Sequence, residues 1–248
     1  MKKTLKRVLL GFAIVIALLV LLSVGFLLKF KHETRNMNVI GSKMVITNIY
    51  AVKDSFVNMF LIGASSQFIA IDAGNSPDNV SKELSKLNIT PDQVIAVFLT
   101  HTDRDHVAAL RLFKKARIYL AREEEPMITG KKSKFLIFGN HIYTKEYSLL
   151  DDQQTVVIGN LQIQGILTPG HTSGSMCYLV NGKYLFTGDL LRLKNGKIGE
   201  FNKFFNMDSK MAKESIKKIT NLPGAEYIFT AHYGYTSDYK NAVKDWKE

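Results

Sequence analysis

The sequence predicts an α+β domain in which two packed β-sheets are flanked by helices, preceded by one transmembrane helix. Short apolar runs rich in β-branched residues occur in two batches, and each batch is followed by segments with helical spacing. Two sheets with helices outside them account for this order better than one doubly wound sheet. The transmembrane helix is predicted from a long uncharged run near the N-terminus.

Residues 8–28, which begin at Val8 and end at Leu28, are these 21 uncharged positions. A helix of this length spans roughly 30 Å, the thickness of the hydrocarbon core of a bilayer. The flank before the run is the more basic one, which predicts a single-pass orientation with the domain outside the cytoplasm. A cleaved signal peptide is the alternative, but no Ala-x-Ala-like site follows the run. We expect an uncleaved anchor in residues 1–35 and one domain in residues 36–248.

The charge balance argues against a nucleic-acid partner. The formal net charge is +11, but the first 35 residues hold seven Lys or Arg and one acid, so the rest of the chain carries only +5. This mild excess suits a domain beside an anionic membrane surface. The densest basic run, Lys131, Lys132 and Lys134, is interpreted as a solvated loop. The single cysteine, Cys177, lies in an apolar run and is expected in the core.

The first half of the domain contains most of the first sheet. Its predicted strands are residues 43–52, 56–62, 67–71, 94–99 and 117–120. Its predicted helices are residues 77–87, 107–115 and 122–130. Ser76 and Pro77 are a typical N-cap and first helical residue. Residues 135–150 are predicted to be irregular, with strand-like pieces.

The second half begins with two hairpins. Residues 155–158 and 161–167 pair through Gly159-Asn160, and residues 175–180 and 183–187 pair through Asn181-Gly182. The remaining predicted elements are a helix at 208–222 capped by Asp208, a strand at 226–230 and a last helix at 237–247.

Four ligand-type residues follow the predicted strand 94–99 within six positions: His101, Asp103, Asp105 and His106. Alternate side chains of extended chain face the same way, so His101 and Asp103 can converge on one point. Asp105 and His106 can reach a second point beside a helix N-terminus, which tolerates a negative charge. This spacing indicates a site for two metal ions.

Three further ligand-type residues stand directly after predicted strands: His171, Asp189 and His232. One histidine after a strand is more often structural than a ligand. Three such positions beside the cluster favour a shared centre, because strand ends converge at a sheet edge and the neighbouring glycines allow close backbone approach.

This set resembles the signature of the metallo-β-lactamase superfamily, in particular its glyoxalase-II-like and lactonase-like hydrolases. The family pattern of His-x-His-x-Asp-His, Gly-His, an Asp after Gly and a final His is matched across residues 40–240. The resemblance implies an αββα sandwich with His101 and His171 on a first metal. The implied ligands of the second metal are Asp105, His106 and His232. Asp189 would bridge both ions, and Asp72 matches the aspartate that supports the metal loop.

Asp103 departs from the family pattern, which usually has a second histidine there. The variant His-x-Asp-x-Asp-His resembles that of some relatives, including nuclease-like domains of DNA-uptake channels. A carboxylate can still coordinate but hardens the site, so manganese, iron or magnesium gains relative to zinc. We expect two divalent ions, with zinc first. The alternative is that Asp103 only caps the next helix and one ion is lost.

The resemblance implies hydrolysis by a hydroxide held between two cations, which Asp189 and Asp105 would orient while Asp105 shuttles a proton. Tyr233 and Tyr235 flank the last ligand, either to donate a hydrogen bond to a developing oxyanion or to pack. The expected substrate is a small carboxylic ester, thioester or lactone. The alternatives are phosphodiesterase or nuclease-like hydrolysis, and a tethered metal-binding or sensing domain without turnover. The oligomeric state is not predicted.

Overall fold

The computed structural model describes residues 2–134 and 139–246. Contacts within the chain divide it into two units, residues 1–37 and 38–248. The first unit contains helix α1 (Lys2–Thr34), with a mean hydropathy of 3.0 over its most apolar stretch. This helix is long and apolar enough to cross a membrane, and a signal sequence would have the same properties.

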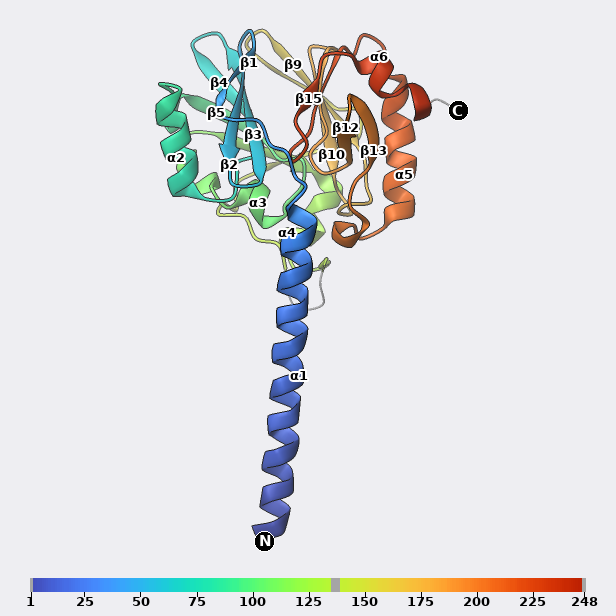
Figure 1. Cartoon of the computed structure of the whole chain (residues 1–248). Helices are drawn as coiled ribbons and strands as arrows, with labels where there is room; N and C mark the ends of the chain where they lie inside the picture. The colour runs from blue at the N-terminus through green and yellow to red at the C-terminus, as the bar shows by residue number, and fades with distance from the viewer. Residues whose placement is uncertain (1, 135–138, 247–248) are drawn as a thin grey trace. The chain divides into compact units, whose positions relative to one another are not determined.

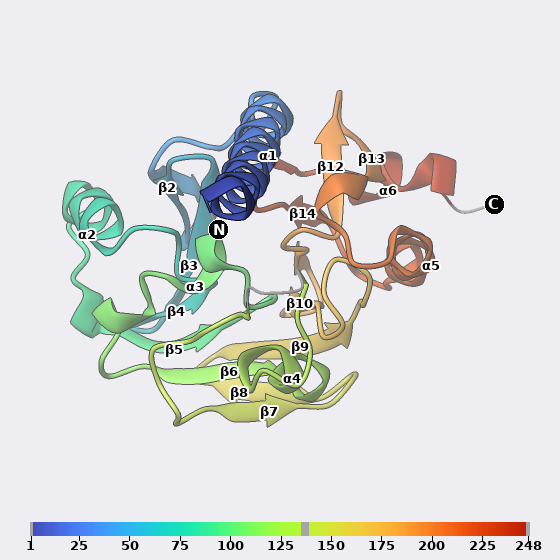
Figure 2. The ribbon, with the colours of Figure 1, turned by 90° about the horizontal axis from the view of Figure 1, so that it is seen from below.

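The second unit contains two mixed β-sheets (Figures 1 and 2). The strands of the seven-stranded sheet are, in spatial order, β1 (Lys43–Ile46), β2 (Ile49–Asp54), β3 (Val57–Ala64), β4 (Gln67–Ile71), β5 (Val94–Phe98), β6 (Arg117–Ala121) and β7 (Ser148–Leu150). Strands β1 to β4 pair in antiparallel fashion, whereas β4 to β7 are parallel neighbours.

The six-stranded sheet is built from the second half of the domain. Its strands are, in spatial order, β15 (Tyr235–Thr236), β14 (Tyr227–Phe229), β11 (Tyr184–Phe186), β10 (Met176–Val180), β9 (Leu161–Leu167) and β8 (Thr155–Ile158). Only β11 and β14 are parallel neighbours. Both predicted hairpins of this half are confirmed.

Buried apolar side chains from both sheets form the central core. The ring of Phe60 in the first sheet lies 5.4 Å from the rings of both Phe186 and Phe229 in the second. Aromatic packing of this kind fixes the separation of two sheets and so the positions of their edges. Cys177 is buried as expected, and burial raises the pKa of its thiol to about 12. Both properties argue against a nucleophilic role for this cysteine.

Helices cover the outer faces of the sandwich (Figure 2). Helix α2 (Pro77–Lys86) buries Val80 and Leu84 against the first sheet. Helices α5 (Ser209–Lys218) and α6 (Tyr239–Ala242) cover the second sheet. The predicted N-caps Ser76 and Asp208 both accept hydrogen bonds from backbone N–H groups of their helices. The layers confirm the predicted αββα fold.

Three predicted elements have different bounds. Residues 43–52 form two strands, because Asn48 has a φ of 62° and folds the chain back. The helix predicted at 107–115 is wrong: α3 spans Arg104–Val107 and a 3-10 turn follows at Leu110–Leu112. The helix ends early because the Ala109 N–H donates to the carbonyl of Gly74. The segment predicted as helical over 122–130 contains a 3-10 turn at Arg122–Glu124 and α4 (Glu125–Ile128).

The end of the chain and the middle loop differ as well. The predicted last helix divides into α6 and a 3-10 turn at Lys244–Trp246, and residue 247 lies outside the described residues. Residues 135–138 of the predicted irregular segment also lie outside them. The hairpin of β12 (Leu191–Lys194) and β13 (Lys197–Glu200) was not predicted. Its turn residues Asn195 and Gly196 both have positive φ, and this dipeptide is a hairpin signal in the sequence.

Candidate metal centre

Five ligand-type residues follow strands that point toward the same edge of the sandwich. In the first sheet β4 and β5 are parallel, and Asp72 and His101 lie just beyond their ends. In the second sheet β9 and β11 are both antiparallel to β10, and β14 is parallel to β11, so these three strands share one direction. His171, Asp189 and His232 follow them. Parallel strand ends meet at one edge, which is where ligand sites form in such sheets.

Asp103 begins helix α3 without capping it. It occupies the N-cap position, but its side chain accepts no hydrogen bond from the first turn of the helix. Its Oδ1 instead accepts a hydrogen bond from Nδ2 of Asn140, and its Oδ2 lies 3.6 Å from Nε2 of His101. The alternative in which Asp103 serves only as a cap is therefore wrong.

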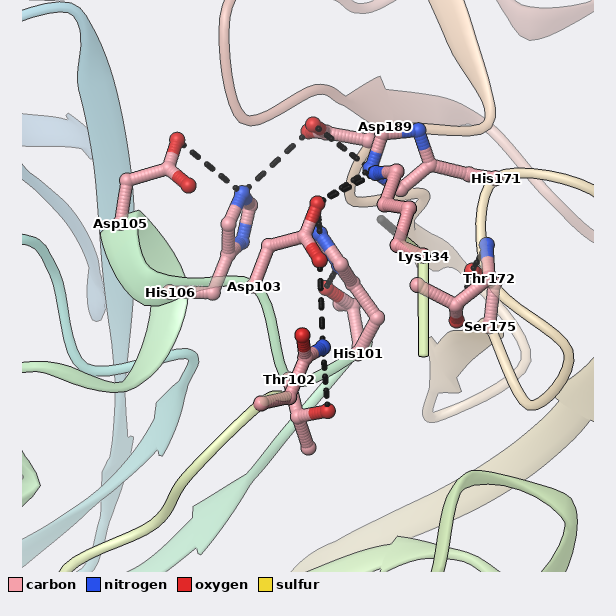
Figure 3. Close-up of polar contacts among 12 residues, drawn as sticks. His101, Thr102, Asp103, Asp105, His106, Lys134, His171, Thr172, Ser175 and Asp189 are labelled. Atoms are coloured by element: carbon pink, nitrogen blue, oxygen red, sulfur yellow. Dashed lines mark hydrogen bonds and ion pairs between the residues drawn. The ribbon is translucent and has the colours of Figure 1, made fainter. Parts of the chain in front are cut away.

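The seven predicted ligands lie together, and Figure 3 labels six of them. They form overlapping groups, and within each group one candidate ligand atom per residue lies within 4.8 Å of the others. The first position comprises His101, Asp103 and His171. The second position comprises Asp105, His106 and His232. A third group, His101, His106 and Asp189, connects the two.

Asp189 lies between the histidines of the two positions. Its Oδ2 lies 3.5 Å from Nε2 of His171, in the first position, and 3.2 Å from Nε2 of His232, in the second. Its Oδ1 lies 3.4 Å from Nε2 of His106 and 3.0 Å from Nε2 of His232, in the second position. The preceding Gly188 lets this loop approach the metal loop, because a Cβ at that residue would meet Oγ1 of Thr100 at 2.5 Å.

All four histidines are oriented by a contact to Nδ1. The partners are Oγ1 of Thr100 for His101 at 3.1 Å, Oδ2 of Asp72 for His106 at 2.8 Å, Oδ1 of Asn206 for His171 at 3.1 Å and the carbonyl oxygen of Phe56 for His232 at 2.6 Å. Carboxylate, amide and carbonyl oxygens can only accept, so Nδ1 carries the proton in the last three. The other nitrogen, Nε2, is then turned toward the shared centre, as in histidines that bind metals.

The centre fits divalent metal ions by the chemistry of its donors. Among the residues that the structure describes, the buried side-chain atoms without a hydrogen-bond partner are Nε2 of His101, Nε2 of His106 and Oδ1 of Asp189. Leaving such atoms unpaired costs about 1–3 kcal/mol each, so native proteins rarely do so. Imidazole nitrogens and carboxylate oxygens that face each other in this way are suited to a shared cation.

The family model of the metallo-β-lactamase superfamily matches residues 52–232, which include most strands of both sheets and every predicted ligand. The chain belongs to the metallo-β-lactamase superfamily. A metallo-β-lactamase family protein from Thermus thermophilus has the same fold, with a TM-score of 0.63 and 17% identity over 82% of this chain and 79% of that one.

Curated relatives within the superfamily are named as hydrolases. A hydroxyacylglutathione hydrolase from Buchnera aphidicola is 28% identical over 77% of this chain and 66% of its own length. A probable polyketide biosynthesis zinc-dependent hydrolase from Bacillus subtilis is 37% identical over 44% of this chain and 46% of its own length. The chain thus spans less than two thirds of the length of each. The zinc-dependent relative supports the use of divalent metal.

The second position of the centre attracts positive charge. Burial would lower the pKa of His106, but Asp189, Asp72 and Asp105 raise it well above its usual range. Burial would also lower the pKa of His232, but Asp189 and Asp105 raise it. The pKa of Asp189 is held well below its usual value, against the effect of burial, by His232 and His106. In the absence of metal, protons on the histidines supply the charge that these carboxylates require.

The first position differs because Lys134 reaches it. The prediction that Lys134 lies on a solvated loop is wrong: its side chain is 6% exposed, whereas Lys131 and Lys132 are exposed. Burial and the Lys134 ammonium lower the pKa of His171 to about 4. Burial would raise the pKa of Asp103, but the same ammonium, with His101 and His171, holds it well below its usual range.

Sequence reasoning also missed Glu124, which connects the two loops of the first position. Its buried carboxylate accepts hydrogen bonds from the N–H and hydroxyl of Thr102, from the hydroxyl of Thr172 and from the N–H of Gly174. Burial raises the pKa of Glu124 despite these donors. Gly174 packs so closely that a Cβ there would lie 2.0 Å from the Glu124 nitrogen. Glu124 sits in an acidic run at the start of a predicted helix, and nothing in that run distinguishes it.

The aromatic rings of Phe201 and Tyr233 lie beside the ligands. The ring of Phe201 lies 5.2 Å from that of His171 and 5.9 Å from that of His232. Tyr233 is 6.0 Å from the same Phe201 ring, which brings it near the centre. Tyr235 instead stacks on Phe229 in the sheet, at 5.4 Å. This contact favours the packing alternative for Tyr235.

Proposed function

We propose that this chain is a hydrolase that uses two divalent ions, with zinc the first choice. The proposed ligands are His101, Asp103 and His171 for the first ion, Asp105, His106 and His232 for the second, and Asp189 for both. The observation that carries the proposal is the inward orientation of four Nε2 atoms around the two oxygens of Asp189. The zinc-dependent relative supports the choice of metal.

The bound ions would supply Lewis acidity and lower the pKa of water by several units. The protein groups then orient the nucleophile and move its proton. The Asp189 side chain is 6% exposed and held between histidines, so it suits a fixed orienting role. The Asp105 side chain is 21% exposed and can exchange a proton with solvent, so it suits the shuttle.

The proposed substrates are carboxylic esters, thioesters or lactones. The relative named hydroxyacylglutathione hydrolase supports a thioester or related acyl compound. A phosphodiester is the second candidate, because Asp103 hardens the site and the Lys134 ammonium could pair with a phosphate.

Turnover by the full chain in detergent tests the proposal. We would measure hydrolysis of an acylglutathione, a γ-lactone, p-nitrophenyl acetate and bis-p-nitrophenyl phosphate. The expected result is turnover of an acyl substrate that a chelator abolishes and zinc restores. Asp189→Ala should lower that rate by about 100-fold or more with the fold intact, whereas Asp92→Ala, an exposed carboxylate paired with Lys115, should not.

Hydrolysis of the phosphodiester alone would replace the acyl substrate with the second candidate. No turnover of any compound by the metal-loaded protein would favour a tethered metal-binding or sensing domain. Substantial activity in Asp189→Ala would contradict the bridging role of that carboxylate.

We further propose that residues 8–28 anchor the protein in a membrane, with residues 36–248 as an extracytoplasmic catalytic domain. The apolar helix α1 supports this assignment. The greater positive charge before the run supports the orientation.

A further inference from the structure

Lys134 contributes an ammonium group to the first metal position. Its Nζ lies 2.5 Å from Oδ2 of Asp103 and 2.9 Å from Nε2 of His171 (Figure 3). Both of these atoms are proposed ligands of the first ion. The ammonium and a metal ion would therefore compete for the same two acceptor atoms.

The surroundings of these two acceptors require a cation between them. Nδ1 of His171 donates to Asn206, and the Lys134 ammonium can only donate, so Nε2 of His171 presents a lone pair to it. That atom lies only 3.1 Å from Oδ2 of Asp103, another acceptor. Two acceptors at this distance repel unless a donor or a metal binds both.

The other oxygen of Asp103 is fixed by a neutral donor. Nδ2 of Asn140 donates to Oδ1 of Asp103 at 3.2 Å and to Oγ1 of Thr102 at 3.0 Å. This contact directs Oδ2 toward Lys134 and the first position. A carboxylate at residue 103 can thus form an ion pair with the lysine, which the histidine of the usual family pattern could not do while neutral.

We infer that Lys134 is a displaceable internal cation that competes with metal for the first position. It neutralises Asp103 until an ion binds, and an ion can enter only when the ammonium leaves. The two positions therefore fill in order, the second position before the first. The inference rests on the ligand assignment of the proposed function, and it concerns metal binding rather than turnover.

Zinc titration of the apo full-length protein in detergent tests this order. Calorimetry would give the affinities, and elemental analysis after dialysis would give the stoichiometry. The wild-type protein should bind one tight equivalent and a second equivalent more weakly, by about tenfold or more, since the entering ion must break charge-assisted hydrogen bonds. Lys134→Met, which removes the ammonium, should strengthen the second equivalent by about tenfold.

Two variants separate the charge from the loop that carries it. Lys134→Arg retains a cation and should keep the unequal affinities of the wild type. Lys131→Met removes an exposed lysine from the same segment and should leave both affinities unchanged. Circular dichroism of each variant would verify folding.

Two equal affinities in the wild-type protein would overturn the inference by themselves, whatever the variants do. Unchanged or weakened zinc binding in a folded Lys134→Met protein would also overturn it. Ordered filling without hydrolysis of any substrate would refute the proposed activity and leave the role of Lys134 supported, so the two proposals fail separately.

Discussion

Asp72 accepts a hydrogen bond from Nδ1 of His106 at 2.8 Å while its own backbone has a left-handed φ of 61°. The same carboxylate accepts hydrogen bonds from the backbone N–H and the hydroxyl of Thr100. That hydroxyl also contacts Nδ1 of His101. One residue at the end of β4 therefore orients a histidine in each metal position.

Replacing Asp72 should weaken metal binding without unfolding the domain. Asp72→Asn preserves the shape and tolerates the left-handed backbone, but it removes the charge behind His106. We expect zinc affinity to fall by about 10–100-fold, measured by calorimetry. Asp72→Ala should also lose about 1–2 kcal/mol of stability in the apo protein, because alanine is strained at this φ. Unchanged zinc affinity in Asp72→Asn would contradict the orienting role.

Glu124 should matter for stability and for the first metal position together. Four donors from Thr102, Thr172 and Gly174 point at its carboxylate. Glu124→Gln places an amide NH₂ against some of these donors, so we expect a loss of about 1–3 kcal/mol in chemical denaturation. The loops carrying Asp103 and His171 should loosen with it and zinc affinity should fall. The exposed neighbour offers a matched control, and Glu123→Gln should change neither quantity. A similar effect in both variants would argue against this role of Glu124.

Zinc affinity at the second position should increase with pH. The surrounding carboxylates raise the pKa values of His106 and His232, so protons compete with zinc for these imidazoles up to a higher pH than at an ordinary histidine. His171, with a pKa of about 4, has no proton to release. Calorimetry in buffers of different ionisation enthalpy should therefore show proton release with the tight equivalent. Zinc binding without proton release at neutral pH would contradict this account.

The same two histidines predict how the stability of the apo protein depends on pH. A raised pKa in the folded state contributes stability that is fully present below 6.5 and lost as the pH rises through the raised values. Denaturation of the apo protein should become easier above neutral pH, and saturating zinc should remove this trend. An apo protein whose stability increases over that range would refute the assignment.

The anchor assignment predicts membrane association through residues 8–28. The full chain should sediment with membranes and resist alkaline carbonate, and mass spectrometry should detect an uncleaved N-terminus. A fragment lacking residues 1–35 should remain soluble and folded. A mature protein that begins after residue 28 would instead identify a signal peptide, and an aggregated fragment would contradict the proposed boundary.

Local patterns sufficed for the parts of the structure that local chemistry determines. The Asn181-Gly182 turn, the caps Ser76 and Asp208 and the ligands placed after strands were all identifiable, because each depends on neighbouring residues. Asn195-Gly196 carries the same kind of turn signal and connects β12 to β13. The early end of α3 was not predictable, since it depends on a hydrogen bond to Gly74, which is distant in the sequence.

The residues that contact the ligands are likewise only partly predictable from the local sequence. His101, Asp105 and His106 are close in sequence, so their spacing indicated a metal loop. Lys134 and Glu124 reach the centre only because the chain after β6 returns to the metal loop, as Thr102 binds Glu124 and Asp103 binds Lys134. No periodicity distinguishes either residue from the charged surface residues beside it.

Anomalous diffraction at the zinc absorption edge, from crystals grown at saturating zinc, is the most direct test of the metal centre. We predict two peaks about 3.5–4 Å apart, one on each side of Asp189. One should lie beside His101 and His171 and the other beside His106 and His232. Peaks elsewhere, or a density map with no ion among these side chains, would contradict the account.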